Sequence, residues 1–224
     1  MTGDACAGNV RLAYSSAMAA PLPNGADPHV SGDEDLMLAY AAGDVGAFDR
    51  LYRRHKGGVY RYLLRHCGNA ATADELFQDV WTNLIRARRS YVPSARFTTW
   101  LYQLARNRVV DHWRAGGRIR VIVDDRQAER EDEEGDAIDV APAPRTVEPD
   151  VLAGAAELRV LIDAALAQLP AAQRDAFLLQ QEGGLELGEI AHLTGVGLET
   201  VKSRLRYAVA KLRTQLGHLH ASGA

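Results

Sequence analysis

Residues 187–213, LGEIAHLTGVGLETVKSRLRYAVAKLR, decide the fold. They predict two helices joined by a tight turn, because Gly195 stands where a helix commonly ends in a left-handed residue and Gly197 follows within the turn. One apolar stripe recurs along the second helix at helical spacing, at Val201, Leu205, Ala208, Val209 and Leu212. The stretch is therefore a helical hairpin whose second helix has one apolar side and one polar side.

The polar side of the second helix favours DNA as its ligand. Between residues 199 and 213, five cations stand against one carboxylate, a net charge of +4, and a basic helix gains affinity from phosphates whatever the base sequence. An amphipathic hairpin with a solvated basic face is the alternative. The small Ala191 at the expected crossing and the glycine-containing turn favour a helix-turn-helix, whose second helix fits the major groove. The candidate DNA contacts are Glu199, Thr200, Lys202, Ser203, Arg204, Arg206 and Tyr207.

The distribution of charge separates basic domains from an acidic linker. The 224 residues carry a formal net charge of −3. Residues 124–150 hold eleven carboxylates and three arginines, a net charge of −8, so the rest of the chain carries +5. Residues 118–150 also contain three prolines, and a compact domain does not need so long a loop. We expect this segment to be a flexible linker.

Helical periodicity without any strand pattern predicts an all-α chain with two small domains joined by this acidic linker. The expected parts are a disordered extension at 1–30, a first domain at 31–117, the linker at 118–150, a second domain with the helix-turn-helix at 151–216, and a tail at 217–224. In the first domain, capping boxes at residues 31–34 and 72–75 mark helix starts. The helices expected there cover residues 47–54, 58–66, 72–89 and 97–114, and the second domain adds a short helix at 173–181.

The sequence offers no support for an enzyme or a metal site. It contains no glycine-rich phosphate loop, HExxH, CxxC or GxSxG motif. Asp74, Glu75 and Asp79 lack the spaced histidine or fourth ligand that a metal needs. Cys6 and Cys67 imply no disulfide framework, which fits a reducing cytosol. Without a signal peptide pattern or a run of about 18 apolar residues, we expect no membrane insertion. We also expect no catalytic residue, cofactor or small-molecule substrate.

A second candidate surface combines aromatic rings with cations. Residues 91–120 carry a net charge of +5 and five aromatic side chains. Bases of single-stranded DNA stack on such rings while arginines hold the phosphates. Trp100 and Trp113, each considered alone, are better explained by core packing, because large aromatic side chains dominate core burial. The loop at 91–96 and its basic flank are the stronger candidates.

These segments resemble one protein family. DELFQDVWTNLIRARRSY (74–91) followed by FTTWLYQLARNRVVDHWR (97–114) resembles the second conserved region of bacterial sigma factors of the sigma-70 family. LPAAQRDAFLL (169–179) followed by residues 188–213 resembles their fourth region. The resemblance covers roughly residues 33–117 and 152–214, and the absence of further domains is similar to the extracytoplasmic-function (ECF) group. It implies a dissociable subunit of RNA polymerase that directs the enzyme to promoters.

The resemblance also implies roles for three sets of residues. Core polymerase would be bound by Asp74, Glu75, Gln78, Asp79, Thr82 and Arg86. The minus-ten element would be recognised and melted by Tyr91, Arg96, Phe97, Asn107, Asp111 and Arg114, with a flipped base held by the loop at 91–98. The minus-thirty-five element would be read by the second hairpin helix, with Arg204 on a phosphate. The implied partners are core RNA polymerase, promoter DNA as duplex and melted strand, and an anti-sigma factor that holds the cytoplasmic protein near the membrane.

Two other functions remain as alternatives. A stand-alone helix-turn-helix regulator would bind duplex DNA without polymerase, and a regulatory adaptor would work through its acidic linker. Neither explains the polar helix face at residues 74–86 together with the aromatic and basic segment. One departure limits the comparison, because Leu198 and Glu199 replace the small or proline-containing turn common in the family. The preferred base sequence therefore does not follow from the resemblance.

Overall fold

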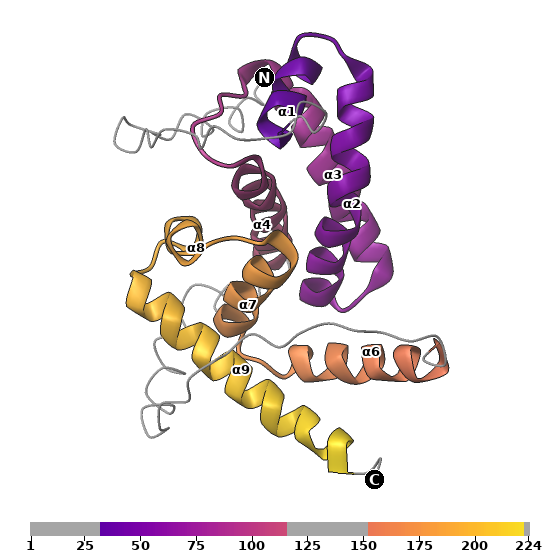
Figure 1. The fold of residues 1–224 in the computed structure, drawn as a ribbon, viewed down its shortest axis with the longest axis vertical. Coiled ribbons are helices and arrows are strands. Elements are labelled where there is room, and N and C mark those ends of the chain that lie inside the picture. Colours follow the sequence, from indigo (N-terminus) through magenta and orange to yellow (C-terminus); the bar gives the residue numbers. More distant parts are fainter. Residues whose placement is uncertain (1–31, 116–151, 222–224) are drawn as a thin grey trace, which may run out of the picture.

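The computed structural model describes residues 32–115 and 152–221, with side chains described for residues 32–115 and 158–216. The regular structure of these residues is entirely helical, which confirms the all-α prediction (Figure 1). The elements are α1 (Asp33–Ala41), α2 (Val45–Cys67), α3 (Ala70–Ala87), η1 (Arg88–Ser90), α4 (Phe97–Ala115), α6 (Leu152–Ala167), α7 (Ala171–Gly183), α8 (Leu187–Thr194) and α9 (Leu198–Ala221). The predicted extension at 1–30 and linker at 118–150 lie outside the described residues.

Helices α1 to α4 form a bundle, here called the N-terminal domain. Its α2 runs without a break, so the prediction of two separate helices at 47–54 and 58–66 is wrong. Gly57 and Gly58 lie in the middle of α2, where glycine is a poor helix former. Leu51, Val59 and Leu63 on either side of this pair are fully buried. Packing of this apolar face against α3 and α4 therefore overrides the low helix propensity of the two glycines.

The start of α3 also differs from the prediction. Gly68 ends α2 in the left-handed conformation, with φ of 67°. Asn69 then caps α3, because its side-chain oxygen accepts a hydrogen bond from the main-chain NH of Thr72 over 3.3 Å. The helix begins at Ala70 and not at the predicted capping box at 72–75. At α1 the N-cap is Gly32, which makes no side-chain cap bond, and Ser31 of the other predicted capping box lies outside the described residues.

Helices α6 to α9 form the C-terminal domain, which contains the predicted helix-turn-helix. Gly195 ends α8 in the left-handed conformation, with φ of 73°, as its position in the sequence predicts. The apolar stripe of α9 faces inward, and Val201 and Ala208 are fully buried. The predicted helix at 173–181 is longer at both ends, as α7. Helix α9 continues to Ala221, past the predicted domain end at residue 216.

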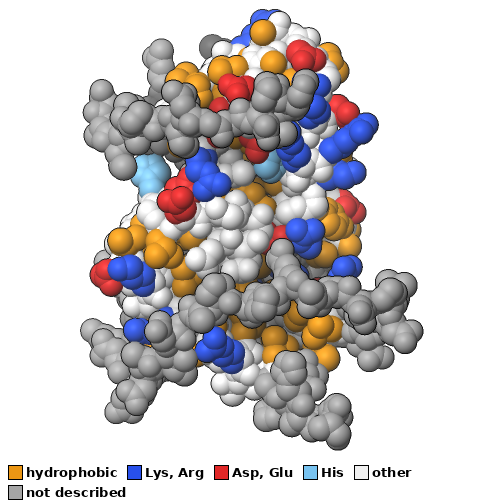
Figure 2. All heavy atoms as spheres, viewed as in Figure 1, with side chains coloured by type: hydrophobic (Ala, Val, Ile, Leu, Met, Phe, Trp, Pro, Cys, Tyr) orange, Lys and Arg blue, Asp and Glu red, His pale blue; other side chains and the backbone are white. Residues whose placement is uncertain are grey.

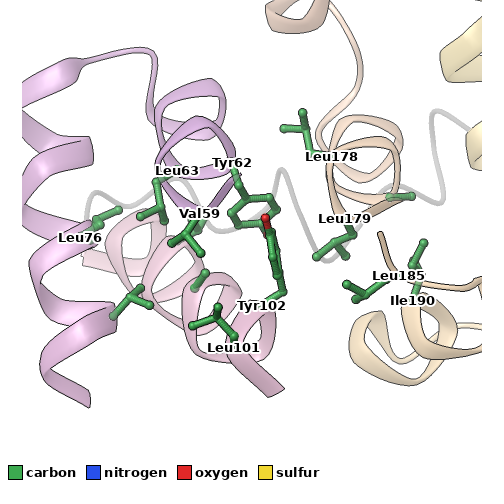
Figure 3. Packing of buried hydrophobic residues seen from close by; sticks show 14 of the residues in the cluster. Val59, Tyr62, Leu63, Leu76, Leu101, Tyr102, Leu178, Leu179, Leu185 and Ile190 are labelled. Carbon is green, nitrogen blue, oxygen red and sulfur yellow. The ribbon is translucent and has the colours of Figure 1, made fainter. Parts of the chain in front are cut away.

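The buried side chains of the two domains form one continuous core. Figure 3 shows Tyr62 and Tyr102 of the N-terminal domain on the side that faces Leu179 and Leu185 of the C-terminal domain. All four of these side chains are at most 2% exposed. Each large apolar side chain buried in this way contributes about 1.5–3 kcal/mol of transfer free energy. The main contacts between the domains are made by α7 with α2 and α4, with smaller contributions from α6 and α8 (Figure 1).

Among the described helices, none combines the length and the apolar composition that a membrane-spanning segment requires.

Candidate functional site

Helix α3 presents the predicted polar face to solvent. Its other side packs in the core through Leu76, Val80 and Leu84. Because the inward side fixes α3 on the bundle, the outward side chains share a rigid support and have no role in the core. The exposed candidates on this face are Asp74, Glu75, Gln78, Asp79, Thr82 and Arg86. We call them the α3 face.

Helix α4 presents a second polar row. Asn107, Asp111 and Arg114 are exposed and stand four and three residues apart, on one side of the helix. Asp111 lies between two cations, with Oδ2 2.7 Å from an Nη atom of Arg108 and Oδ1 3.8 Å from Arg114. These ion pairs hold the row in place but leave Asn107 open to an incoming ligand.

Two residues assigned to the minus-ten element are buried instead. Phe97 is fully buried and Tyr91 is 9% exposed. Their rings pack against each other and against Trp100, with centroid distances of 6.3 Å between Tyr91 and Phe97 and 4.9 Å between Tyr91 and Trp100. Burial raises the pKa of the Tyr91 hydroxyl. In this structure both rings belong to the core beneath the loop at 91–96, and their contact with the minus-ten element stays a prediction.

Two arginines near this row bind the C-terminal domain. Nη1 of Arg96 lies 3.3 Å from Oε2 of Glu189 and donates to the carbonyl oxygen of Gly184 over 3.3 Å. Nε of Arg106 donates to Oδ2 of Asp175 over 2.8 Å. Asp175 is only 3% exposed. The basic segment predicted to hold DNA phosphates is therefore partly engaged by carboxylates of the same chain.

Sequence reasoning missed Asp175, although its position carries a signal. In α7 it stands between Ala172 and Ala176, which are both buried. A carboxylate on the apolar face of a helix predicts a buried ion pair, because a charge is rarely buried without a partner. The capping box at the start of α8 was also missed, with Glu189 accepting from the main-chain NH of Glu186 over 2.8 Å.

Helix α9 carries the third polar surface, on the side away from its buried stripe. Arg206 is exposed and its guanidinium lies 5.0 Å from the ring centroid of Tyr207. Lys202 pairs with Glu199 over 2.8 Å, and Ser203 donates to the main-chain oxygen of Glu199 over 3.0 Å. These intrahelical contacts orient the side chains before any ligand binds. Thr200 and Arg204 complete the set and are half-buried.

The three surfaces are made of polar and charged side chains. Within residues 32–115 and 158–216, no group of three or more His, Cys, Asp or Glu side chains is arranged to hold a metal ion. Figure 2 shows Lys and Arg side chains over both halves of the molecule on the face drawn there. Polar and cationic surfaces on three helices therefore present hydrogen-bond donors and charge to large ligands.

Comparisons with known proteins agree with this arrangement. The family profile for sigma-70 region 2 matches residues 51–119, and that for sigma-70 region 4 matches residues 159–212. The ECF RNA polymerase sigma factor SigM of Mycobacterium tuberculosis is 31% identical over 193 residues, which cover 86% of this chain and 88% of SigM. The RNA polymerase sigma factor CarQ of Myxococcus xanthus is 32% identical over 183 residues, or 82% of this chain and 97% of CarQ.

Two solved structures share the fold. CnrH, determined in complex with the cytosolic domain of CnrY, has a TM-score of 0.56 at 22% identity, covering 84% of this chain and 99% of CnrH. RpoE of Bartonella quintana, determined in complex with the anti-sigma factor NepR, has a TM-score of 0.55 at 20% identity, covering 77% of this chain and 98% of RpoE. With both conserved regions in order and relatives matched over most of their length, this chain belongs to the ECF group of RNA polymerase sigma factors of the sigma-70 family.

Proposed function

We propose that this protein binds core RNA polymerase through α3 and directs it to promoters by using α4 at the minus-ten element and α9 at the minus-thirty-five element. The observation that carries this proposal is that one chain presents three exposed polar surfaces on three different helices. Each surface lies opposite a buried apolar side, so each is available for a partner without cost to the core.

The α3 face suits a protein partner. Its residues include both signs of charge, with Asp74, Glu75 and Asp79 against Arg86, together with two neutral polar side chains. Mixed polar groups on a fixed helix face favour complementary contacts with another protein, since charge complementarity sets register and excludes wrong partners. DNA would instead be repelled by the three carboxylates.

The row on α4 suits single-stranded DNA. Asn107 is exposed and its amide can donate to and accept from one base edge, while Arg114 can hold a phosphate. Arg96, assigned to the same element, joins this surface once its bonds to Glu189 and Gly184 are released. The buried rings of Tyr91 and Phe97 would then fix the loop in which a flipped base is held.

The outward side of α9 suits duplex DNA. Lys202 and Arg206 are exposed cations one turn apart, and a guanidinium can make two hydrogen bonds to one guanine in the major groove. Glu199, Thr200, Ser203 and Tyr207 surround these cations, and Arg204, at the edge of the surface, is placed for a phosphate.

The proposal predicts that the purified chain plus core polymerase starts transcripts from a promoter that core alone ignores. Asp79→Arg, on the α3 face, should abolish these transcripts while leaving DNA binding by α9 intact. A stand-alone regulator gives the opposite result, because it binds promoter DNA equally well without polymerase and produces no transcript in any combination.

We further propose a regulatory partner and a place of action. The solved structures of CnrH and RpoE, which share this fold, contain CnrY and the anti-sigma factor NepR respectively. By analogy, this chain acts in the cytoplasm and is held inactive by a dedicated inhibitor, which can tether it near the membrane. Affinity capture from cells grown under varied stress conditions tests this point. Recovery of polymerase without any inhibitor in every condition would contradict it.

A further inference from the structure

Three carboxylates of the C-terminal domain form hydrogen bonds and ion pairs with the N-terminal domain. Asp175 and Glu182 lie on α7 and Glu189 on α8, each seven residues after the last. We call these three residues the acidic row. Asp175 and Glu182 stand two turns apart on one side of α7, and Glu189 follows in the first turn of α8, so the three carboxylates can bind along a neighbouring helix pair. In this structure that pair is α2 and α4.

Asp175 occupies the centre of the contact between the domains. Its Oδ1 accepts a hydrogen bond from the Tyr62 hydroxyl over 2.8 Å, and His66 Nε2 lies 3.4 Å from the same oxygen. Its Oδ2 accepts from Arg106 Nε over 2.8 Å. Burial by itself raises the pKa of Asp175, but the nearby His66 ring and the charge of Arg106 outweigh it and hold the pKa well below its usual range. The carboxylate is therefore charged and fully bonded when the domains are together.

Glu182 binds two arginines of α2 at the end of α7. Arg61 Nε donates to its Oε2 over 2.8 Å, and Arg65 Nη1 donates to Oε1. The main-chain oxygen of Glu182 accepts from the Tyr102 hydroxyl over 2.6 Å. This approach depends on Gly58, because a Cβ there would lie 2.7 Å from the Tyr102 hydroxyl and 3.0 Å from the oxygen of Glu182. The close packing of Tyr102 and Glu182 thus explains why a glycine stands at position 58 in the middle of α2.

Glu189 of α8, the third member of the acidic row, contacts the start of α4. The hydroxyl of Thr99 donates to its Oε1, and Arg96 Nη1 lies 3.3 Å from its Oε2. Thr99 is 3% exposed. Arg96 and Arg106, the cations at either end of this row, both belong to the segment that is proposed to bind the minus-ten element.

The contact is incompatible with reading both promoter elements at once. Elements near minus ten and minus thirty-five are about 25 base pairs apart, or roughly 85 Å of duplex at 3.4 Å per base pair. Here α7 and α8 pack on both α4 and α9, and packed helix axes lie about 8–10 Å apart. Helix α9 has 24 residues and so is only about 36 Å long. No rotation of DNA about this compact form brings α4 and α9 to both elements.

We propose that this structure is a closed resting form, in which the acidic row latches the C-terminal domain onto the cations of α2 and α4 and masks part of the promoter-binding surface. Promoter DNA that carries both elements binds the open form, so its apparent affinity falls in proportion to the fraction of chain that is open. The α3 face is exposed in the closed form. The effect of the latch on promoter binding rests on the proposed function. The closed form itself can be measured on the free chain.

The two adjacent glycines of α2 allow a matched test. Gly58→Ala places a methyl group against the Tyr102 hydroxyl and the Glu182 oxygen, while Gly57→Ala meets only the end of the Arg61 side chain, 3.3 Å away. Both changes put the better helix former into the same helix, so they differ chiefly at the latch. Glu182→Arg is a second opening variant, because it places a cation between Arg61 and Arg65.

The full chain is measured free in solution by small-angle X-ray scattering and then titrated with promoter DNA that carries both elements. Gly58→Ala and Glu182→Arg should increase the radius of gyration and keep the helix content seen by circular dichroism. If the closed form of the unchanged chain outnumbers the open form about tenfold, both variants should bind this DNA up to about tenfold more tightly. Gly57→Ala should match the unchanged chain in both measurements.

Two results would overturn the latch. One is a Gly58→Ala chain and a Glu182→Arg chain that both stay as compact as the unchanged protein. The other is expansion of both chains with no gain in affinity for the promoter DNA. Failure of the proposed function looks different, because then the unchanged chain and all three variants give no transcript with core polymerase, whatever their radius of gyration.

Discussion

Oε1 of Glu34, in the first turn of α1, accepts a hydrogen bond over 2.6 Å from the main-chain NH of Phe97, the first residue of α4. A helix leaves its first NH groups without partners inside the helix, and a carboxylate at that end also interacts favourably with the helix dipole. Here the acceptor comes from 63 residues earlier in the chain. Glu34 therefore ties α1 to the point where the loop at 91–96 becomes α4.

Glu34→Ala should lower the free energy of unfolding by about 1–2 kcal/mol, the usual cost of losing a helix cap. Glu34→Gln should cost less, because the amide oxygen still accepts the bond. Asp35→Ala is the matched control, since Asp35 is the exposed neighbour in the same turn. Urea denaturation compares the four chains. Equal losses for Glu34→Ala and Asp35→Ala would show that the bond to Phe97 contributes nothing.

Asp33 gives a prediction about pH. Burial alone raises the pKa of Asp33, but hydrogen bonds from His55 at 2.8 Å and Arg54 at 2.7 Å outweigh it, so the net pKa is lowered from the ordinary value of 3.8. A lowered pKa stabilises the fold above the ordinary value and loses this effect as pH falls through the folded value. Asp33→Asn should therefore be less stable than the unchanged chain at pH 6, by about 1 kcal/mol.

The difference between the Asp33→Asn chain and the unchanged chain should shrink as pH falls below 3.8. Midpoints of urea unfolding at several pH values give this difference directly. A gap that is the same at pH 6 and at about pH 2 would mean that the charge of Asp33 is not what stabilises the contact.

Asp79→Arg should weaken binding to core polymerase without unfolding the chain. Asp79 is exposed on α3, opposite the buried Val80 and Leu84. Reversing its charge removes a contact and adds repulsion, which costs a few kcal/mol when the pair is buried at an interface. Asp49→Arg, at an exposed aspartate of α2, is the control for charge alone. If the Asp79→Arg chain binds core polymerase with unchanged affinity in a titration, the α3 face is not part of the interface.

Arg206 and Arg204 should have different roles on α9. Arg206→Ala should cost about 1–3 kcal/mol at the preferred upstream site and relax selectivity at one base position if the exposed guanidinium reads a base, as proposed. Arg204→Ala should weaken binding to all sequences alike and lower the salt slope by about one, as expected for a phosphate contact.

Binding selections on randomised upstream sequences separate these two effects. Neither variant should unfold the domain, because the buried stripe of α9 is made by Val201, Leu205, Ala208 and Leu212. An unchanged selected motif for Arg206→Ala would show that α9 sits in the groove at a different rotation.

The parts of the fold that sequence predicts are those set by local pattern. The hairpin of α8 and α9 follows from its apolar stripe and from Gly195, since helical periodicity and a left-handed glycine both act within a few residues. Phe97 likewise marks the start of α4 in both the prediction and the structure. Such features depend on short-range geometry and need no knowledge of the rest of the chain.

The parts that sequence does not predict are those set by distant partners. Gly57 and Gly58 read as a break in isolation, but the surroundings of α2 keep it continuous and the approach of Tyr102 and Glu182 requires Gly58. Tyr91 read as a DNA contact because its neighbours are basic, whereas Trp100 and Phe97 bury it. For Gly58 the deciding residues lie far along the chain, whereas Tyr91 folds back onto rings only six and nine residues away.

The packing of the Tyr102 ring on Gly183 gives the closed form a dependence on temperature. A Cβ at position 183 would come within 3.3 Å of two ring carbons, so the ring lies directly on the backbone, and Tyr102 is 2% exposed. Opening the molecule would hydrate this ring and raise the heat capacity. Because apolar burial stabilises less on cooling, the closed fraction should fall slightly as the temperature is lowered.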